Sequence, residues 1–127
     1  MFEADRASRG MGIDVVERRE GHATARMKVR PDMVNGHGMA HGGFVFTIAD
    51  TAFAFACNSA GAAAVAASAE ITFVSPAQVG EVLIAEAALR TRFGRNGIYD
   101  VTVRAGDRVI AEFRGRSHDL GRPPGAP

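Results

Sequence analysis

The stretch Asn35-Gly-His-Gly-Met-Ala-His-Gly-Gly43 leads directly into an apolar segment that carries a single acid, Asp50. Glycine lets the backbone turn freely and lets other groups approach it closely. The residues up to Ser59 are almost all apolar, and Gly61 stands where a helix often ends. The stretch therefore predicts a helix from Gly42 or Gly43 to Ser59, apolar on nearly every side, which other parts of the protein must cover.

Strand-like segments lie on both sides of this helix in the sequence. Apolar and polar residues alternate in several of them, as in Tyr99, Val101 and Val103. The connections are short, which favours antiparallel neighbours. We predict an α+β fold in which one curved antiparallel sheet wraps around one long helix, with strands at 11–19, 22–30, 63–75, 81–93, 98–105 and 108–118.

The composition is that of a soluble globular protein, with 46% hydrophobic and 23% charged residues. The 127 residues predict one domain spanning 1–127, with flexible ends at 1–10 and 120–127. A net charge of +1 argues against a nucleic-acid partner, and the longest apolar run is too short to span a membrane. The lone Cys57 and the charged, leaderless first residues predict a cytoplasmic protein.

Asp50 is the first candidate for chemistry. On a helix it shares a narrow stripe with Thr47, Thr51 and Asn58, while phenylalanines occupy much of the remaining surface. A buried carboxylate without partners costs several kcal/mol, so an acid in such surroundings is rarely idle. The alternative is that the stripe faces solvent or a neighbouring subunit, and the pattern alone does not decide between them.

The His41-Gly42-Gly43 opening is the second candidate. Unpaired N–H groups at a helix start suit a carbonyl oxygen that becomes an oxyanion, although the glycines could serve local geometry alone. No Gly-Lys-Ser/Thr follows, which excludes a phosphate-binding P-loop. His37 and His41 have no evident third ligand, so we predict no metal. Cys57 lies deep in the helix with no reason to be a thiolate.

Taken together, Asn35, His41-Gly42-Gly43 and Asp50 at this spacing, followed by Thr51-Ala-Phe-Ala-Phe-Ala-Cys-Asn58, closely resemble the hotdog-fold acyl-CoA thioesterases. The resemblance is strongest to the PaaI type of phenylacetate catabolism. It extends over about residues 11–119 and includes Ile71-Thr-Phe-Val-Ser-Pro76. The resemblance implies hydrolysis of a phenylacetyl-CoA-type thioester, with coenzyme A as part of the substrate and no separate cofactor.

The resemblance also implies roles for individual residues. Asp50 is the catalytic carboxylate, acting as general base or as nucleophile, and the Gly42 N–H polarises the thioester carbonyl. Asn35 positions the water or the carboxylate, and His41 supports the start of the helix. The residues expected to bind the substrate are Gly43, Met39, Phe44, Thr51 and Ser68, of which Ser68 is the hydroxyl on the strand after the helix that would orient the water. Those expected to meet coenzyme A are Arg90, Arg92, Arg95 and Asn96.

Helix geometry adds a constraint. Gly42 and Asp50 are eight residues apart, or ~12 Å along one helix, whereas an attacking water and the polarised carbonyl oxygen lie within a few ångströms of each other. The site is therefore expected to be shared, with Gly42 from one subunit and Asp50 from another. We predict a homodimer of paired hotdogs, and the resemblance implies a homotetramer.

Two other functions fit the same fold. A hotdog hydratase or dehydratase uses a histidine together with a carboxylate, but the predicted helix contains no histidine. A non-catalytic acyl-CoA-binding sensor would keep the pocket and lose the carboxylate, whereas this chain keeps Asp50.

Overall fold

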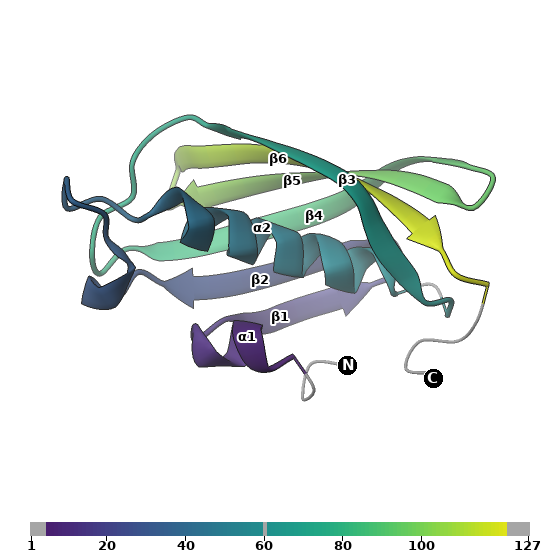
Figure 1. Cartoon of the computed structure of the whole chain (residues 1–127), viewed down its shortest axis with the longest axis horizontal. Helices are drawn as coiled ribbons and strands as arrows, with labels where there is room; N and C mark the ends of the chain where they lie inside the picture. The colour runs from purple at the N-terminus through teal and green to yellow at the C-terminus, as the bar shows by residue number, and fades with distance from the viewer. Residues whose placement is uncertain (1–4, 60, 122–127) are drawn as a thin grey trace.

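The computed structural model describes residues 5–59 and 61–121. The six strands form one antiparallel sheet in the order β1-β2-β4-β5-β6-β3. The predicted α+β plan, with one long helix and one sheet, is confirmed (Figure 1). The elements are α1 (Arg6–Gly10), β1 (Asp14–Arg19), β2 (His22–Lys28), the 3-10 turn η2 (Pro31–Met33), α2 (Gly42–Cys57), β3 (Ala64–Phe73), β4 (Val82–Phe93), β5 (Asn96–Ala105) and β6 (Arg108–Asp119).

The helix α2 lies along one face of the sheet and contacts all six strands, so the sheet curves around it (Figure 1). Phe53 of α2 anchors the core, with its ring centroid 5.6 Å from that of Tyr99 and 5.7 Å from that of Phe113. Gly115 of β6 lies directly beneath this ring, because a Cβ there would be only 2.8 Å from it. A side chain at position 115 would therefore push α2 away from the sheet.

The two edge strands of the sheet differ in charge. In β1, four of six residues are charged, which discourages pairing with another strand. In β3, one residue of ten is charged, and eight of the ten are exposed. The edge formed by β3 is therefore long, nearly uncharged and open to a further strand.

The N-terminal segment differs from the prediction of a flexible end. Residues 6–10 form α1, which Asp5 caps by accepting a hydrogen bond from the Ser8 N–H at 3.0 Å. Ser8 is buried against α2. Periodicity could not reveal a helix of five residues, although an Asp three positions before a Ser is a capping signal. The predicted flexible C-terminal end lies outside the described residues from 122 onward.

Bulges change which face of the sheet some side chains occupy. The pairing register shifts between Ala66 and Ser68 in β3, and between Leu89 and Thr91 in β4. Because side chains alternate along a strand, one extra residue moves every later side chain to the other face. Both shifts affect residues that the sequence assigned to the site.

Candidate active site

The start of α2 leaves one backbone donor free. His41 is the N-cap, and its Nδ1 accepts a hydrogen bond from the Gly43 N–H at 3.0 Å. The Phe44 N–H donates to the His41 carbonyl at 3.0 Å. Within the described residues, nothing accepts a hydrogen bond from the Gly42 N–H. This N–H, at the positive end of a helix of 16 residues, is available to a ligand oxygen.

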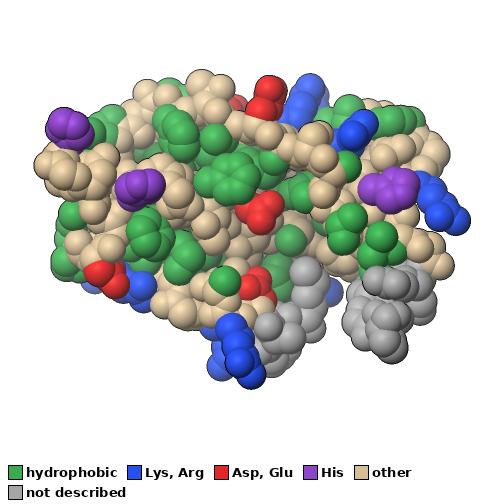
Figure 2. Space-filling model, viewed as in Figure 1, with side chains coloured by type: hydrophobic (Ala, Val, Ile, Leu, Met, Phe, Trp, Pro, Cys, Tyr) green, Lys and Arg blue, Asp and Glu red, His purple; other side chains and the backbone are tan. Residues whose placement is uncertain are grey.

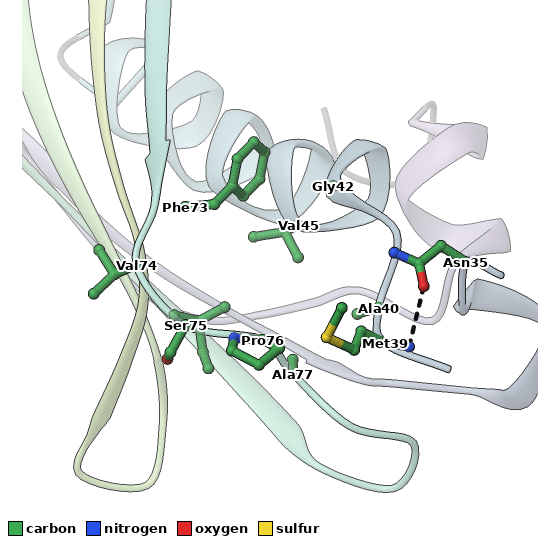
Figure 3. Close-up of a pocket in the computed structure, with 11 residues that line it drawn as sticks. Asn35, Met39, Ala40, Gly42, Val45, Phe73, Val74, Ser75, Pro76 and Ala77 are labelled. Atoms are coloured by element: carbon green, nitrogen blue, oxygen red, sulfur yellow. Dashed lines mark hydrogen bonds between the residues drawn. The ribbon is translucent and has the colours of Figure 1, made fainter. Parts of the chain in front are cut away.

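A pocket of about 360 Å³ opens at this helix start (Figure 3). It lies between the loop before α2 and the end of β3 with the segment that follows it. The phenyl ring of Phe73 covers Gly42, so that a Cβ on Gly42 would be 3.0 Å from the ring's Cζ. The lining is mostly apolar and consists of Asn35, Met39, Ala40, Gly42, Val45, Phe73, Val74, Ser75, Pro76, Ala77 and Ile110.

Asn35 holds the loop before the helix and retains one unused donor. Its Oδ1 accepts a hydrogen bond from the Met39 N–H at 3.2 Å (Figure 3). The same oxygen accepts a second hydrogen bond from the His37 N–H at 2.9 Å. The backbone N–H of Asn35 donates to the Met39 carbonyl at 2.7 Å. Since these bonds fix the amide orientation, the Nδ2 group remains as a donor, with no acceptor among the described residues. Asn35 can therefore donate to a substrate or a water in the pocket.

Asp50 lies two turns along α2 and does not line this pocket. Its side chain is half-buried, and no other described residue donates a hydrogen bond to its carboxylate. Burial raises the pKa of Asp50, and the negative charge of Asp5 on α1 raises it further. Figure 2 shows acidic side chains set among hydrophobic ones on the face that carries α2. Such a carboxyl group is a stronger base than an exposed aspartate.

Of the residues predicted to bind the substrate, the structure brings only Met39 into the pocket. Thr51 is buried, and its hydroxyl is 2.8 Å from the Ser8 hydroxyl, so it holds α1 rather than facing a ligand. Phe44 packs edge-on against His41, with ring centroids 6.4 Å apart, and lies outside the pocket lining. Gly43 is occupied in capping the helix.

Ser68 is also placed away from the pocket. The register sets it opposite Arg116 in β6, whereas the next pair joins Ala69 to Gly115. Gly115 faces Phe53 of α2, so Arg116 and Ser68 lie on the outer face of the sheet. The bulge after Ala66 reverses the alternation, so within this chain Ser68 does not face the Gly42 pocket, and its contribution of a hydroxyl to the site stays a prediction.

The predicted coenzyme A residues do not form one patch. Arg90 pairs with Asp100 on the outer face at 3.2 Å, whereas Arg92, beyond the bulge, pairs with Asp119 at 3.4 Å. Asp119 is opposite Ala64, at the start of β3. Arg95 packs against Gly121, and Asn96 contacts His118 at 3.3 Å. Arg92, Arg95 and Asn96 lie near the Ala64 end of β3, whereas Arg90 is level with the middle of that strand and Gly42 contacts Phe73 at its other end.

Other chemistries find no support in the described part of the chain. Burial raises the pKa of the Cys57 thiol to about 12, which rules out a thiolate nucleophile at neutral pH. Among the described residues, no group of three or more histidine, cysteine or acidic side chains could hold a metal ion. Within the same residues, no helix has the length and apolar character needed to cross a membrane.

Eight of the eleven lining residues were not assigned to the site from the sequence, among them Phe73 and Val45. Phe73 lies in the Ile71–Pro76 motif, which predicted a strand but did not indicate that this strand would lie next to Gly42. Its position over Gly42 depends on β3 crossing the start of α2, and only the fold reveals that crossing.

Comparisons with known proteins agree with this geometry. The thioesterase superfamily matches residues 37–112. The acyl-coenzyme A thioesterase PaaI of Escherichia coli (strain K12) is 43% identical over 122 residues, covering 95% of this chain and 87% of that protein. Human acyl-coenzyme A thioesterase 13 is 31% identical, covering 93% of this chain and 88% of that protein.

Solved structures are similar over the same length. The E. coli PaaI protein from the phenylacetic acid degradation operon superposes with a TM-score of 0.94 at 42% identity, covering 97% of this chain and 90% of that chain. A variant of the phenylacetic acid degradation protein PaaI from Thermus thermophilus gives a TM-score of 0.88 at 34% identity, covering 91% and 100% of the two chains.

The chain belongs to the thioesterase superfamily. Within it, the chain is an acyl-CoA thioesterase of the PaaI type, and the predicted hotdog fold is confirmed. The helix start with its free N–H and the half-buried acid are therefore the two features of this thioesterase from which its chemistry is best argued.

Proposed function

We propose that this thioesterase hydrolyses phenylacetyl-CoA or a ring-hydroxylated relative to the free acid and coenzyme A in phenylacetate catabolism. The observation that carries the proposal is the free Gly42 N–H at the mouth of a mostly apolar pocket that Phe73 partly covers. The names of the E. coli and T. thermophilus relatives refer to phenylacetic acid degradation. A flat aryl group suits a pocket walled by an aromatic ring and aliphatic side chains.

In the proposed mechanism, the Gly42 N–H receives the thioester carbonyl oxygen and stabilises the oxyanion that forms when the carbonyl carbon is attacked. Asp50 supplies the carboxylate that activates a water or attacks the carbon itself. Asn35 donates from its Nδ2 to the water or to the substrate carbonyl. On the general-base route the C–S bond then breaks, and the proton taken from water passes to the coenzyme A thiolate as the acid is released. On the nucleophilic route the C–S bond breaks to leave an Asp50 anhydride, and water then cleaves this anhydride to the acid and the free Asp50 carboxylate.

One chain does not hold these groups together, since Gly42 and Asp50 stand ~12 Å apart along α2. We propose that a second copy completes each site. The nearly uncharged β3 edge supports this, because it is free to pair with the β3 of another chain. Pairing about a two-fold axis runs the two β3 strands antiparallel, which brings the Phe73 end of one beside the Ala64 end of the other.

The same symmetry gives the hairpin arginines a role. The Gly42 pocket of one chain then lies beside the β4–β5 hairpin of the other, which carries Arg92 and Arg95. We propose that coenzyme A phosphates reach this hairpin across the dimer, and that two such dimers form a tetramer. Sedimentation equilibrium checks the assembly, which should have two or four times the 13.4 kDa mass of the chain.

The shared site can be tested by complementation. Gly42→Pro removes the N–H, and proline is well tolerated at the first helical position. The preceding His41 already has φ −62° and ψ 137°, which a following proline requires. Chains carrying Gly42→Pro and chains carrying Asp50→Asn would be co-expressed with different tags and purified through both tags.

Each mixed dimer then has one site with both groups intact and one site lacking both. We expect about half of the wild-type kcat per dimer, whereas each variant alone is inactive. Mixed dimers of the correct mass that remain inactive would refute the shared site.

A panel of acyl-CoA substrates tests specificity, and aliphatic substrates turned over with higher kcat/KM than phenylacetyl-CoA would refute the aryl assignment.

A further inference from the structure

The short helix α1 holds a second carboxylate near Asp50 through two hydroxyl groups. The Ser8 hydroxyl is 2.7 Å from Asp5 Oδ2 and 2.8 Å from the Thr51 hydroxyl. Ser8 and Thr51 are 2% and 4% exposed, so water does not compete for these bonds. Thr51 is the residue after Asp50 on α2.

The direction of these bonds follows from the chemistry of the groups. An ionised carboxylate only accepts hydrogen bonds, so the single Ser8 hydroxyl proton is donated to Asp5. The Ser8 oxygen then accepts, and Thr51 is the donor in the 2.8 Å contact. Asp5 also accepts from the Ser8 N–H. The chain of bonds from Thr51 to Ser8 to Asp5 thus fixes the place of the Asp5 carboxylate.

We propose that α1 is a positioning element of the active site, in which the buried hydroxyls of Ser8 and Thr51 hold the Asp5 carboxylate so that its negative charge acts on the Asp50 carboxylate during catalysis. This inference rests on the proposed role of Asp50 in thioester hydrolysis. Asp5 itself does not touch substrate. It acts through Asp50, and α1 is thereby part of the catalytic apparatus although it lies outside the Gly42 pocket.

Among the groups around Asp50, Asp5 is the charged residue that raises the pKa of its carboxyl group. Burial and Asp5 are the two influences that raise the pKa of Asp50. On α2 the other titratable group is Cys57, which is neutral, since its pKa is about 12. The strands packed against α2 present mostly apolar side chains to it. Examples of the apolar set are Met27, Leu83, Val101 and Phe113. The exception is Arg18 of β1, which lies opposite the buried Ala23 and places its guanidinium 5.4 Å from the centre of the Phe55 ring of α2. The helix α1 itself carries Arg6 and Arg9.

The test replaces Asp5 by asparagine. Asparagine caps a helix as well as aspartate does, so Asp5→Asn removes the charge and keeps the hydrogen bond from the Ser8 N–H. With less repulsion, Asp50 keeps its charge to lower pH. The acid limb of the kcat/KM profile should therefore move to lower pH. At the pH where the wild-type kcat/KM is half of its maximum, the kcat/KM of the variant should be more than half of its own maximum. The matched control, Asp14→Asn, removes an exposed acid at the start of β1 and should leave the limb in place.

A second readout does not depend on activity. The titration of Asp50 is followed by carbon NMR with carboxyl-labelled aspartate, and its signal is assigned by its loss in Asp50→Asn. A lower midpoint in Asp5→Asn, with the pH profile moving in parallel, supports the inference. An unchanged Asp50 midpoint overturns it. A lowered midpoint with an unmoved pH profile overturns the catalytic role of Asp50 instead, so the two failures are distinguishable.

Discussion

Two polar positions on α2, the backbone N–H of Gly42 and the carboxyl group of Asp50, have surroundings that are opposite in kind. Gly42 opens the helix beside an apolar pocket and offers a free N–H. Asp50, two turns on, has no hydrogen-bond donor among the described residues and lies near a second carboxylate held by α1. One end is suited to receive negative charge and the other to hold a base. The difference supports the proposal that a single chain presents two half-sites.

The largest effect is expected at Asp50. Asp50→Asn should lower kcat by roughly 10²–10⁴-fold, with KM little changed, because the isosteric amide cannot act as a base. Steady-state kinetics with phenylacetyl-CoA measure this. Turnover of phenylacetyl-CoA at the wild-type rate would show that Asp50 is not the catalytic carboxylate.

The same variant should not lose stability. Because the pKa of Asp50 is raised in the folded state, this group stabilises the fold when protonated, and that contribution is lost as pH rises through the folded-state pKa. At neutral pH the ionised acid is therefore a cost that asparagine removes. We expect Tm equal to or above that of the wild type at pH 7, and a lower Tm would mean that Asp50 has a structural partner.

At the Gly42 end, the informative contrast is between two substitutions. Gly42→Ala and Gly42→Pro both place a Cβ 3.0 Å from the Phe73 ring, but only proline removes the N–H. Proline should therefore cost roughly 10²–10³-fold more kcat than alanine, the usual effect of losing one oxyanion donor. Equal kcat values in the two variants would show that crowding, and not the N–H, is what matters at this position.

Phe73 should affect binding more than chemistry. Phe73→Leu removes the ring over Gly42 and keeps an apolar wall, so we expect KM for phenylacetyl-CoA to rise severalfold, about 1 kcal/mol for the lost aromatic contact. The kcat should change little, because the ring donates nothing to the reacting atoms. Val79→Leu provides a control at an exposed apolar residue outside the pocket lining. A fall in kcat with constant KM would assign the ring to the chemical step.

The sequence was most informative about the loop and helix in which the residue types and the apolar pattern indicate the same structure. The glycine-rich loop, the apolar helix and the spacing to Asp50 predicted the helix and the two proposed half-sites, because each depends on local sequence. The faces that Ser68 and Arg92 occupy could not be predicted, because bulges reverse the face of a strand and the sequence around 66–68 and 89–91 carries no mark of an extra residue. Thr51 was assigned to substrate because its partner, Ser8, is 43 residues away in the chain.

The smallest expected effect compares two threonines one turn apart on α2. Thr51 donates through a buried bond to Ser8 of α1, whereas Thr47 donates to the Gly43 carbonyl of its own helix at 2.8 Å, near the Gly42 end and exposed to water. Thr51→Val should lower the free energy of unfolding by about 1 kcal/mol, since Ser8 loses a buried donor. Thr47→Val should leave it nearly unchanged, because the Gly43 carbonyl keeps its other partners. Urea unfolding measures both free energies, and the pH profile of Thr51→Val adds a second measurement.

If α1 loosens when the bond from Thr51 to Ser8 is lost, the Asp5 charge moves away from Asp50 and the acid limb moves to lower pH, as in Asp5→Asn. A Thr51→Val enzyme that is less stable but has an unmoved acid limb would mean that this bond only fastens α1, and that the Asp50 half-site does not depend on it.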